Sequence, residues 1–140
     1  MIPITVVDVS DSEPLVVEVL RSGAIAQGPM VARLEDGFAR VAGVPHAIAV
    51  NSGTTALVAS LQVLGLKPGD EVVTSPFTFV ATVNAILEAG ATVRFADISA
   101  TDFCMDPDAV AAAIGPRTKT LMPVHLYGEM ADMGRLVPLA

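Results

Sequence analysis

The sequence predicts an α/β fold with a mainly parallel sheet flanked by helices. Segments with the apolar spacing of helices alternate along the chain with short apolar runs typical of buried strands. Only short links separate them, and such alternation favours parallel strands whose connecting helices pack over the faces of the sheet. The length of 140 residues suits one ordinary domain.

The first part of the chain predicts two helices. Residues 11–23 predict a helix because a cap-type serine and an early proline begin it and a glycine ends it. Residues 24–29 read as a loop, and 29–43 again carry apolar residues at helical spacing. We therefore expect an N-terminal helix and loop over residues 1–27, followed by a larger domain over residues 28–140.

The elements that follow alternate between strand and helix. In order, we expect a buried strand at 46–50, a helix at 54–65, a strand around 71–75, a helix at 79–90, a strand at 91–98, a helix at 106–115 and a strand within 118–128. Residues 130–140 begin like another helix and stop without a cap, from which we expect a truncated chain.

Composition narrows the classes of function. Apolar residues make up 52% of the chain and charged residues 16%, which excludes a disordered protein. The mean hydropathy of +0.61 is high, so we expect much of the surface to meet a partner subunit or a further part of the chain. A net charge of −7 without a Lys/Arg cluster disfavours nucleic acid and anionic membranes as partners.

The sequence indicates neither export nor a metal site. The N-terminus has no basic region typical of a signal peptide, and no apolar run approaches the roughly 18 residues that cross a bilayer. Cys104 is the only cysteine, which fits a reducing cytoplasm. His46 and His125 are far apart and lack ligand spacing, so no metal is expected.

The stretch "VNSGTTAL" at residues 50–57 predicts a phosphate site. It follows an apolar run and begins a helix, where backbone N–H groups lack partners and the helix dipole is positive. Gly53 permits close approach, and Ser52, Thr54 and Thr55 supply hydroxyl donors, so an anion could bind there without lysine or arginine. The alternative is a capped helix that binds nothing.

Two further strand ends carry candidate side chains. In "SPFTFVAT", Phe77 and Phe79 could stack on a flat heterocycle, or they could pack in the core. In "PVHLYG", His125 could donate to a ligand or act as an acid–base group, and Tyr127 could hydrogen-bond; a structural histidine is the alternative. Asp97 also follows a strand, where a loop-capping role is favoured over a functional one.

Taken together and in this order, the three stretches resemble one family. The sequence from "GPMVARLEDGFARVAG" through "NSGTTAL" and "SPFTFVAT" to "PVHLYGEMADM", roughly residues 28 to 133, is similar to the N-terminal part of pyridoxal-phosphate-dependent sugar aminotransferases of the DegT/DnrJ/EryC1/StrS type. The resemblance implies the large domain of fold type I, nucleotide-linked keto-sugars and glutamate as substrates, and a homodimer with active sites between subunits.

The resemblance also implies roles for individual residues. Ser52, Gly53 and Thr54 match the segment that contacts the phosphate of pyridoxal 5'-phosphate, and Phe79 matches the aromatic residue that stacks on its ring. His125 and Tyr127 match a landmark in the vicinity of substrate or cofactor. The loop "GAIAQGP" departs from the family, because an aromatic residue often replaces its alanine or isoleucine.

The resemblance leaves three functions open. The family's Schiff-base lysine and its acid that pairs with the pyridine nitrogen lie downstream of the matched region, and Lys67 and Lys119 match neither position. We therefore expect no catalytic residue here and no transamination by these 140 residues alone. The alternatives to an aminotransferase segment are a segment of a sugar dehydratase from the same family and a non-catalytic remnant or dimerisation module.

Overall fold

The computed structural model describes residues 8–140, and residues 1–7 lie outside the description, as does the part of the signal-peptide expectation that concerns them. The chain divides into two compact units, Met1–Ala49 and Val50–Ala140. The domain boundary expected at residue 28 concerns the large domain of the family and stays a prediction. No helix among the described residues is both long and apolar enough to cross a membrane.

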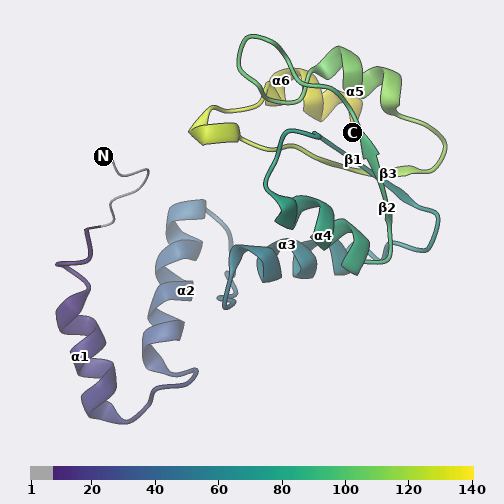
Figure 1. The fold of residues 1–140 in the computed structure, drawn as a ribbon. Coiled ribbons are helices and arrows are strands. Elements are labelled where there is room, and N and C mark those ends of the chain that lie inside the picture. Colours follow the sequence, from purple (N-terminus) through teal and green to yellow (C-terminus); the bar gives the residue numbers. More distant parts are fainter. Residues whose placement is uncertain (1–7) are drawn as a thin grey trace. The chain divides into compact units, whose positions relative to one another are not determined.

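The described part of the first unit contains the two predicted helices, α1 (Glu13–Ser22) and α2 (Pro29–Ala42) (Figure 1). Each ends at a glycine with a left-handed backbone, Gly23 at φ 71° and Gly43 at φ 68°. Glycine takes this conformation without the penalty that a Cβ atom brings, which is why both glycines stop their helices.

The predicted strand at 46–50 is wrong. This segment pairs with no strand among the described residues, and the Ile48 side chain is 84% exposed. The backbone N–H of Ala49 donates a hydrogen bond to the side-chain atom Glu35 Oε1 at 2.8 Å. Apolar composition predicts burial, but a strand also needs a neighbour whose N–H and C=O groups complete its hydrogen bonds.

The second unit contains the remaining elements. They are α3 (Gly53–Gln62), β1 (Glu71–Thr74), α4 (Val80–Glu88), β2 (Thr92–Phe95), α5 (Pro107–Ala113), β3 (Thr118–Met122), the 3-10 turn η1 (Leu126–Gly128), α6 (Met133–Leu136) and the 3-10 turn η2 (Val137–Leu139). Each helix and strand predicted between residues 54 and 122 is present, with ends that differ from the expectation by a few residues.

The sheet has the order β2-β1-β3, with both pairings parallel. Its central strand is buried throughout, and Val72 and Val73 point to opposite faces. Val72 packs with α3 and α4 through residues such as Val58 and Ile86. Val73 belongs to the second core, which α5 and α6 help to form (Figure 1). The fold class predicted from the sequence, helices on a parallel sheet, is confirmed.

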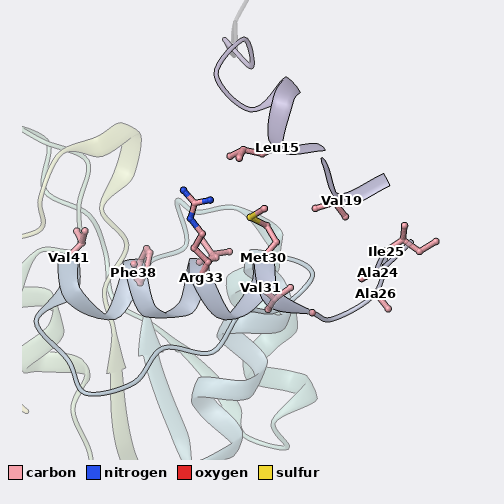
Figure 2. A pocket seen from close by; sticks show the side chains of 13 residues that line it. Leu15, Val19, Ala24, Ile25, Ala26, Met30, Val31, Arg33, Phe38 and Val41 are labelled. Carbon is pink, nitrogen blue, oxygen red and sulfur yellow. The ribbon is translucent and has the colours of Figure 1, made fainter. Parts of the chain in front are cut away.

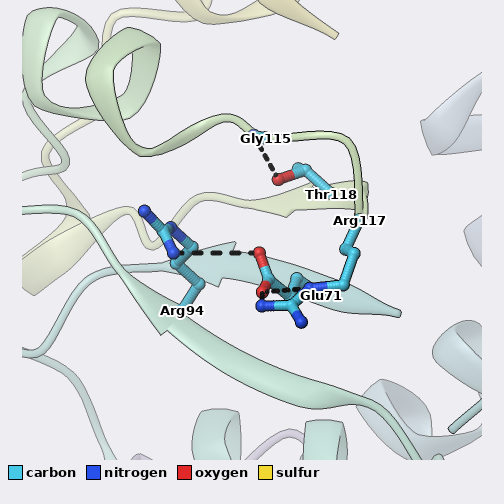
Figure 3. Close-up of polar contacts among 5 residues, drawn as sticks. All are labelled: Glu71, Arg94, Gly115, Arg117 and Thr118. Atoms are coloured by element: carbon cyan, nitrogen blue, oxygen red, sulfur yellow. Dashed lines mark hydrogen bonds and ion pairs between the residues drawn. The ribbon is translucent and has the colours of Figure 1, made fainter. Parts of the chain in front are cut away.

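An ion-pair cluster links Glu71, the first residue of β1, to Arg94 of β2 and to Arg117, which directly precedes β3 (Figure 3). Glu71 opens β1 with a side chain that is only 7% exposed, and its Oε1 accepts from Arg117 Nη2 at 2.6 Å and Nε at 3.0 Å. Arg94 of β2 approaches Glu71 Oε2 at 4.0 Å. The guanidinium groups compensate the cost of burying the Glu71 carboxylate.

Candidate functional site

The start of α3 is the first part of the candidate site. Ser52 is its N-cap, and Ser52 Oγ accepts from the Thr55 N–H at 3.2 Å. The Ser52 carbonyl accepts from the Ala56 N–H at 3.1 Å. Helix geometry leaves the N–H groups of Gly53 and Thr54 without acceptors inside the helix. These two groups and the nearby hydroxyls form a set of donors at one exposed point.

The surroundings of this point favour an anion. The first turn of α3 carries no acidic residue, and the helix dipole adds partial positive charge there. Space is also available: a Cβ atom placed on Gly53 would meet nothing within 4 Å. The structure thus retains the open helix start that the sequence predicts, together with the serine cap that was its alternative.

Two phenylalanines follow β1 at the start of α4. Core packing, one of the two interpretations of the sequence, is wrong for both rings, because Phe77 is 44% exposed and Phe79 is 74% exposed. Phe79 is the N-cap residue of α4, and no side chain caps this helix. Figure 1 shows α3 and α4 side by side and running in the same direction, so their N-termini lie at the same end of the helical layer. Phe79 is therefore presented at the same end as Ser52 and Gly53.

The segment after β3 carries His125 and Tyr127. His125 Nδ1 accepts from the Ala131 N–H at 3.1 Å, which is a structural use of that nitrogen and leaves Nε2 for a ligand. Tyr127 is 90% exposed and has a left-handed backbone at φ 53°, an unfavourable conformation for an aromatic residue. Its ring meets Phe77 edge to face, with 6.5 Å between centroids. The fold thus brings the ends of β1 and β3 together.

Three other residues weighed in the sequence lie outside this arrangement. Asp97 is exposed, and its Oδ1 accepts from the N–H of Ile98, a local loop contact. Lys67 and Lys119 are exposed and line a hollow together with Asp70, beside the amino ends of β1 and β3. The structure therefore gives no support for promoting either lysine to a cofactor residue.

Sequence reasoning missed two features of the site. Phe103 contacts Phe77 edge to face at 6.3 Å, although nothing in the local pattern around Phe103 indicates a partner 26 positions away. Asn51 accepts a hydrogen bond from the Thr55 hydroxyl at 2.7 Å. The spacing of four residues across a helix start was a usable signal for this second contact.

A separate apolar hollow of about 700 Å³ lies within the first unit (Figure 2). Leu15 and Val19 of α1 line it with Met30 and Phe38 of α2, and Arg33 is its one charged residue. None of the residues predicted from the sequence to bind the cofactor phosphate or to stack on its ring lines this hollow. The apolar lining follows from the amphipathic faces of the two helices.

Comparison with known proteins places this chain in a family. A model of the DegT/DnrJ/EryC1/StrS aminotransferase family matches residues 8–140. The spore coat polysaccharide biosynthesis protein SpsC of Bacillus subtilis is 46% identical over 125 residues, 89% of this chain and 32% of that protein. The dTDP-3-amino-3,4,6-trideoxy-alpha-D-glucose transaminase of Micromonospora megalomicea is 43% identical over 123 residues, 88% of this chain and 33% of that protein.

Solved structures agree with the sequence relatives. The structure of NtdA from Bacillus subtilis, with the bound cofactor PMP, superposes with a TM-score of 0.88 at 39% identity, over 94% of this chain and 30% of that one. The chain spans about a third of the length of the relatives that it matches. With the family model covering all described residues, the chain belongs to the DegT/DnrJ/EryC1/StrS aminotransferase family.

Proposed function

We propose that this chain holds pyridoxal 5'-phosphate, with Ser52, Gly53 and Thr54 around the phosphate and Phe79 against the pyridine ring. The observation that carries the proposal is the open start of α3, where Gly53 leaves free space and the first N–H groups of the helix lack intrahelical acceptors. The cofactor PMP in the NtdA structure supports it, because PMP is the aminated form of the same cofactor.

The residues present fit this group chemically. A phosphate dianion needs several donors and no carboxylate nearby, and the first turn of α3 provides N–H groups and hydroxyls without an acid. A planar pyridine ring needs an accessible aromatic face, and Phe79 is 74% exposed at the adjacent helix start. When bound, pyridoxal phosphate supplies the electron sink for amine chemistry. The chain's own part is to bind and orient it.

For the whole protein we propose an aminotransferase that acts on a nucleotide-linked keto-sugar, with glutamate as amino donor. The transaminase of Micromonospora megalomicea described above is named for a dTDP-linked amino sugar, which supports a nucleotide-linked sugar as the substrate class. The Schiff-base lysine and the pyridine-pairing acid are then supplied by sequence beyond these 140 residues. His125 Nε2 and Tyr127 lie at the neighbouring strand end, where they could meet substrate or cofactor.

We also propose that the protein is a cytoplasmic homodimer. Exposed apolar side chains on α2 support the dimer, because Leu34 is 59%, Phe38 62% and Val41 88% exposed. The single cysteine, Cys104, is a buried free thiol, as a reducing compartment permits.

Binding of pyridoxine 5'-phosphate tests the phosphate site. This probe carries the phosphate and the ring but no aldehyde, so it cannot form a Schiff base with surface lysines. We expect the wild-type chain to bind it and Gly53→Asp to lose binding, because the new carboxylate brings charge and bulk to the helix start. Calorimetric titration measures the affinity.

Gly115→Asp is the matched control. It introduces the same group at another glycine with free space and no positive φ, in the loop before β3 at the opposite end of the sheet. We expect wild-type affinity for this variant. Equal affinity of Gly53→Asp and wild type, or no binding by the wild-type chain, would contradict the proposed function.

A further inference from the structure

The turn that follows β3 displays Tyr127 in an unfavourable backbone conformation. Tyr127 at φ 53° and Gly128 at φ 87° are two consecutive left-handed residues, and Tyr127 is exposed. A tyrosine holds this conformation only where its surroundings compensate the strain, because the left-handed region brings Cβ close to the backbone. The contacts at the two ends of the turn therefore decide whether Tyr127 stays in place.

His125 ties the beginning of this turn to its end. Its Nδ1 accepts a hydrogen bond from the N–H of Ala131, six residues along the chain, at 3.1 Å. Ala131 is only 1% exposed and belongs to the same core as Val73. A buried N–H without an acceptor is costly, because it has lost its hydration and gained nothing in return. Loss of Nδ1 as an acceptor would thus release the turn at its buried end.

The same contact fixes the proton on the imidazole ring. A neutral imidazole carries one proton, and the nitrogen that accepts a hydrogen bond is the one without it. Nδ1 accepts from Ala131, so the proton of neutral His125 lies on Nε2. A general base needs a free lone pair, and neither nitrogen offers one, because Nε2 is protonated and Nδ1 is engaged. The arrangement favours donation to a ligand over the acid–base role weighed from the sequence.

We propose that His125 is a positioning residue: Nδ1 holds the turn that presents Tyr127, and Nε2 is a hydrogen-bond donor that takes no part in proton transfer. The part of this inference that concerns a ligand rests on the proposed function, in which both residues meet substrate or cofactor. The hydrogen bond to Ala131 does not, because it forms without a ligand. The Phe77 ring, 6.5 Å from that of Tyr127 between centroids, contacts the tyrosine that the turn presents.

Two substitutions separate the nitrogens of the ring. His125→Asn places its amide oxygen as many bonds from Cα as Nδ1, so it keeps an acceptor for Ala131 and loses the Nε2 donor. His125→Gln reaches the position of Nε2 instead and leaves no acceptor at that of Nδ1. We expect the Ala131 amide to exchange with solvent at the wild-type rate in the Asn variant. In the Gln variant we expect exchange about 5- to 100-fold faster, the range of one lost buried hydrogen bond.

Tyr127 supplies a second reporter. The chain has one tyrosine and no tryptophan, so its tyrosine fluorescence comes from Tyr127 alone. We expect the fluorescence anisotropy to keep its wild-type value in His125→Asn and to fall in His125→Gln, because a released turn lets the ring move faster. A histidine whose role is unrelated to the turn would leave the anisotropy of both variants unchanged, which would overturn the inference.

The experiment is NMR spectroscopy of the wild-type chain and both variants without ligand, at about pH 8, above the range in which imidazole ordinarily titrates. Nitrogen shifts report which ring nitrogen is protonated, and the signals that His125→Asn removes distinguish His125 from His46. A protonated Nε2, together with slow Ala131 exchange in the Asn variant alone, supports the inference. A protonated Nδ1, or equal exchange in the two variants, overturns it. Because no ligand is present, neither result bears on the proposed phosphate site.

Discussion

At the scale of single residues, the helix start at Ser52 and Gly53 was predictable because capping and backbone freedom are local properties. A small polar cap residue followed by glycine leaves the first N–H groups of a helix accessible in any fold. The hydrogen bonds that Thr55 makes with Asn51 and Ser52 were less accessible, since hydroxyl partners depend on side-chain rotamers that sequence spacing alone does not determine.

Phe79→Ala tests the proposed stacking at this scale. We expect the affinity for pyridoxine 5'-phosphate to fall about three- to tenfold, the range of one aromatic contact, and the affinity for inorganic phosphate to stay unchanged. Phe79→Tyr retains the ring and should bind like the wild-type chain. Competition titrations with the two ligands measure both values. Equal losses for both ligands would show that Phe79 supports the helix start and does not stack.

At the scale of elements, periodicity and end signals located the helices well. Gly23 and Gly43 ended α1 and α2 as predicted, since a left-handed residue after a helix is a local property. The strand predicted at 46–50 failed because pairing is not local. Its apolar pattern is present, but no described strand lies beside it to complete a ladder.

Glu71 provides a prediction about the sheet. Glu71→Gln removes the charge that pairs with Arg117 and faces Arg94, and we expect the free energy of unfolding to fall by about 1–2 kcal/mol. This range is modest because both arginine side chains are substantially exposed, at 70% and 47%. Urea denaturation measures the change.

Arg135→Gln is the control for the Glu71 experiment. It breaks the pair with Asp108, whose side chains are 54% and 79% exposed, so we expect a loss below about 0.5 kcal/mol. Similar losses for the two variants would mean that burial of the Glu71 carboxylate adds nothing to the stability of the sheet.

At the scale of the whole molecule, the high apolar content of the sequence predicted that much of its surface meets a partner subunit or a further part of the chain. The described residues include large exposed apolar side chains, among them Ile48, Val41 and Val63, each more than 80% exposed. The relatives are about three times as long as the matched segment, and in a protein of that length the further residues would cover part of this surface. The proposed dimer would account for a further part.

Light scattering at several concentrations tests the dimer. We expect a mass of twice the 14.4 kDa of the chain at micromolar concentration, with dissociation on dilution, because exposed apolar surface associates with a free energy that depends on its buried area. A mass of one chain at every concentration would contradict the proposed homodimer for this chain. Pyridoxine 5'-phosphate binding measured alongside reports whether the phosphate site remains formed.

The sequence by itself determined the parallel α/β class, the positions of its helices and the open helix start at Gly53, because these follow from periodicity, end signals and backbone chemistry. Only the tertiary structure decided that Phe77 and Phe79 are exposed and that Tyr127 meets Phe77 across the ends of β1 and β3. It also decided that residues 46–50 lack a partner strand. Burial and pairing join residues far apart in the chain, so they depend on the packing of the whole fold.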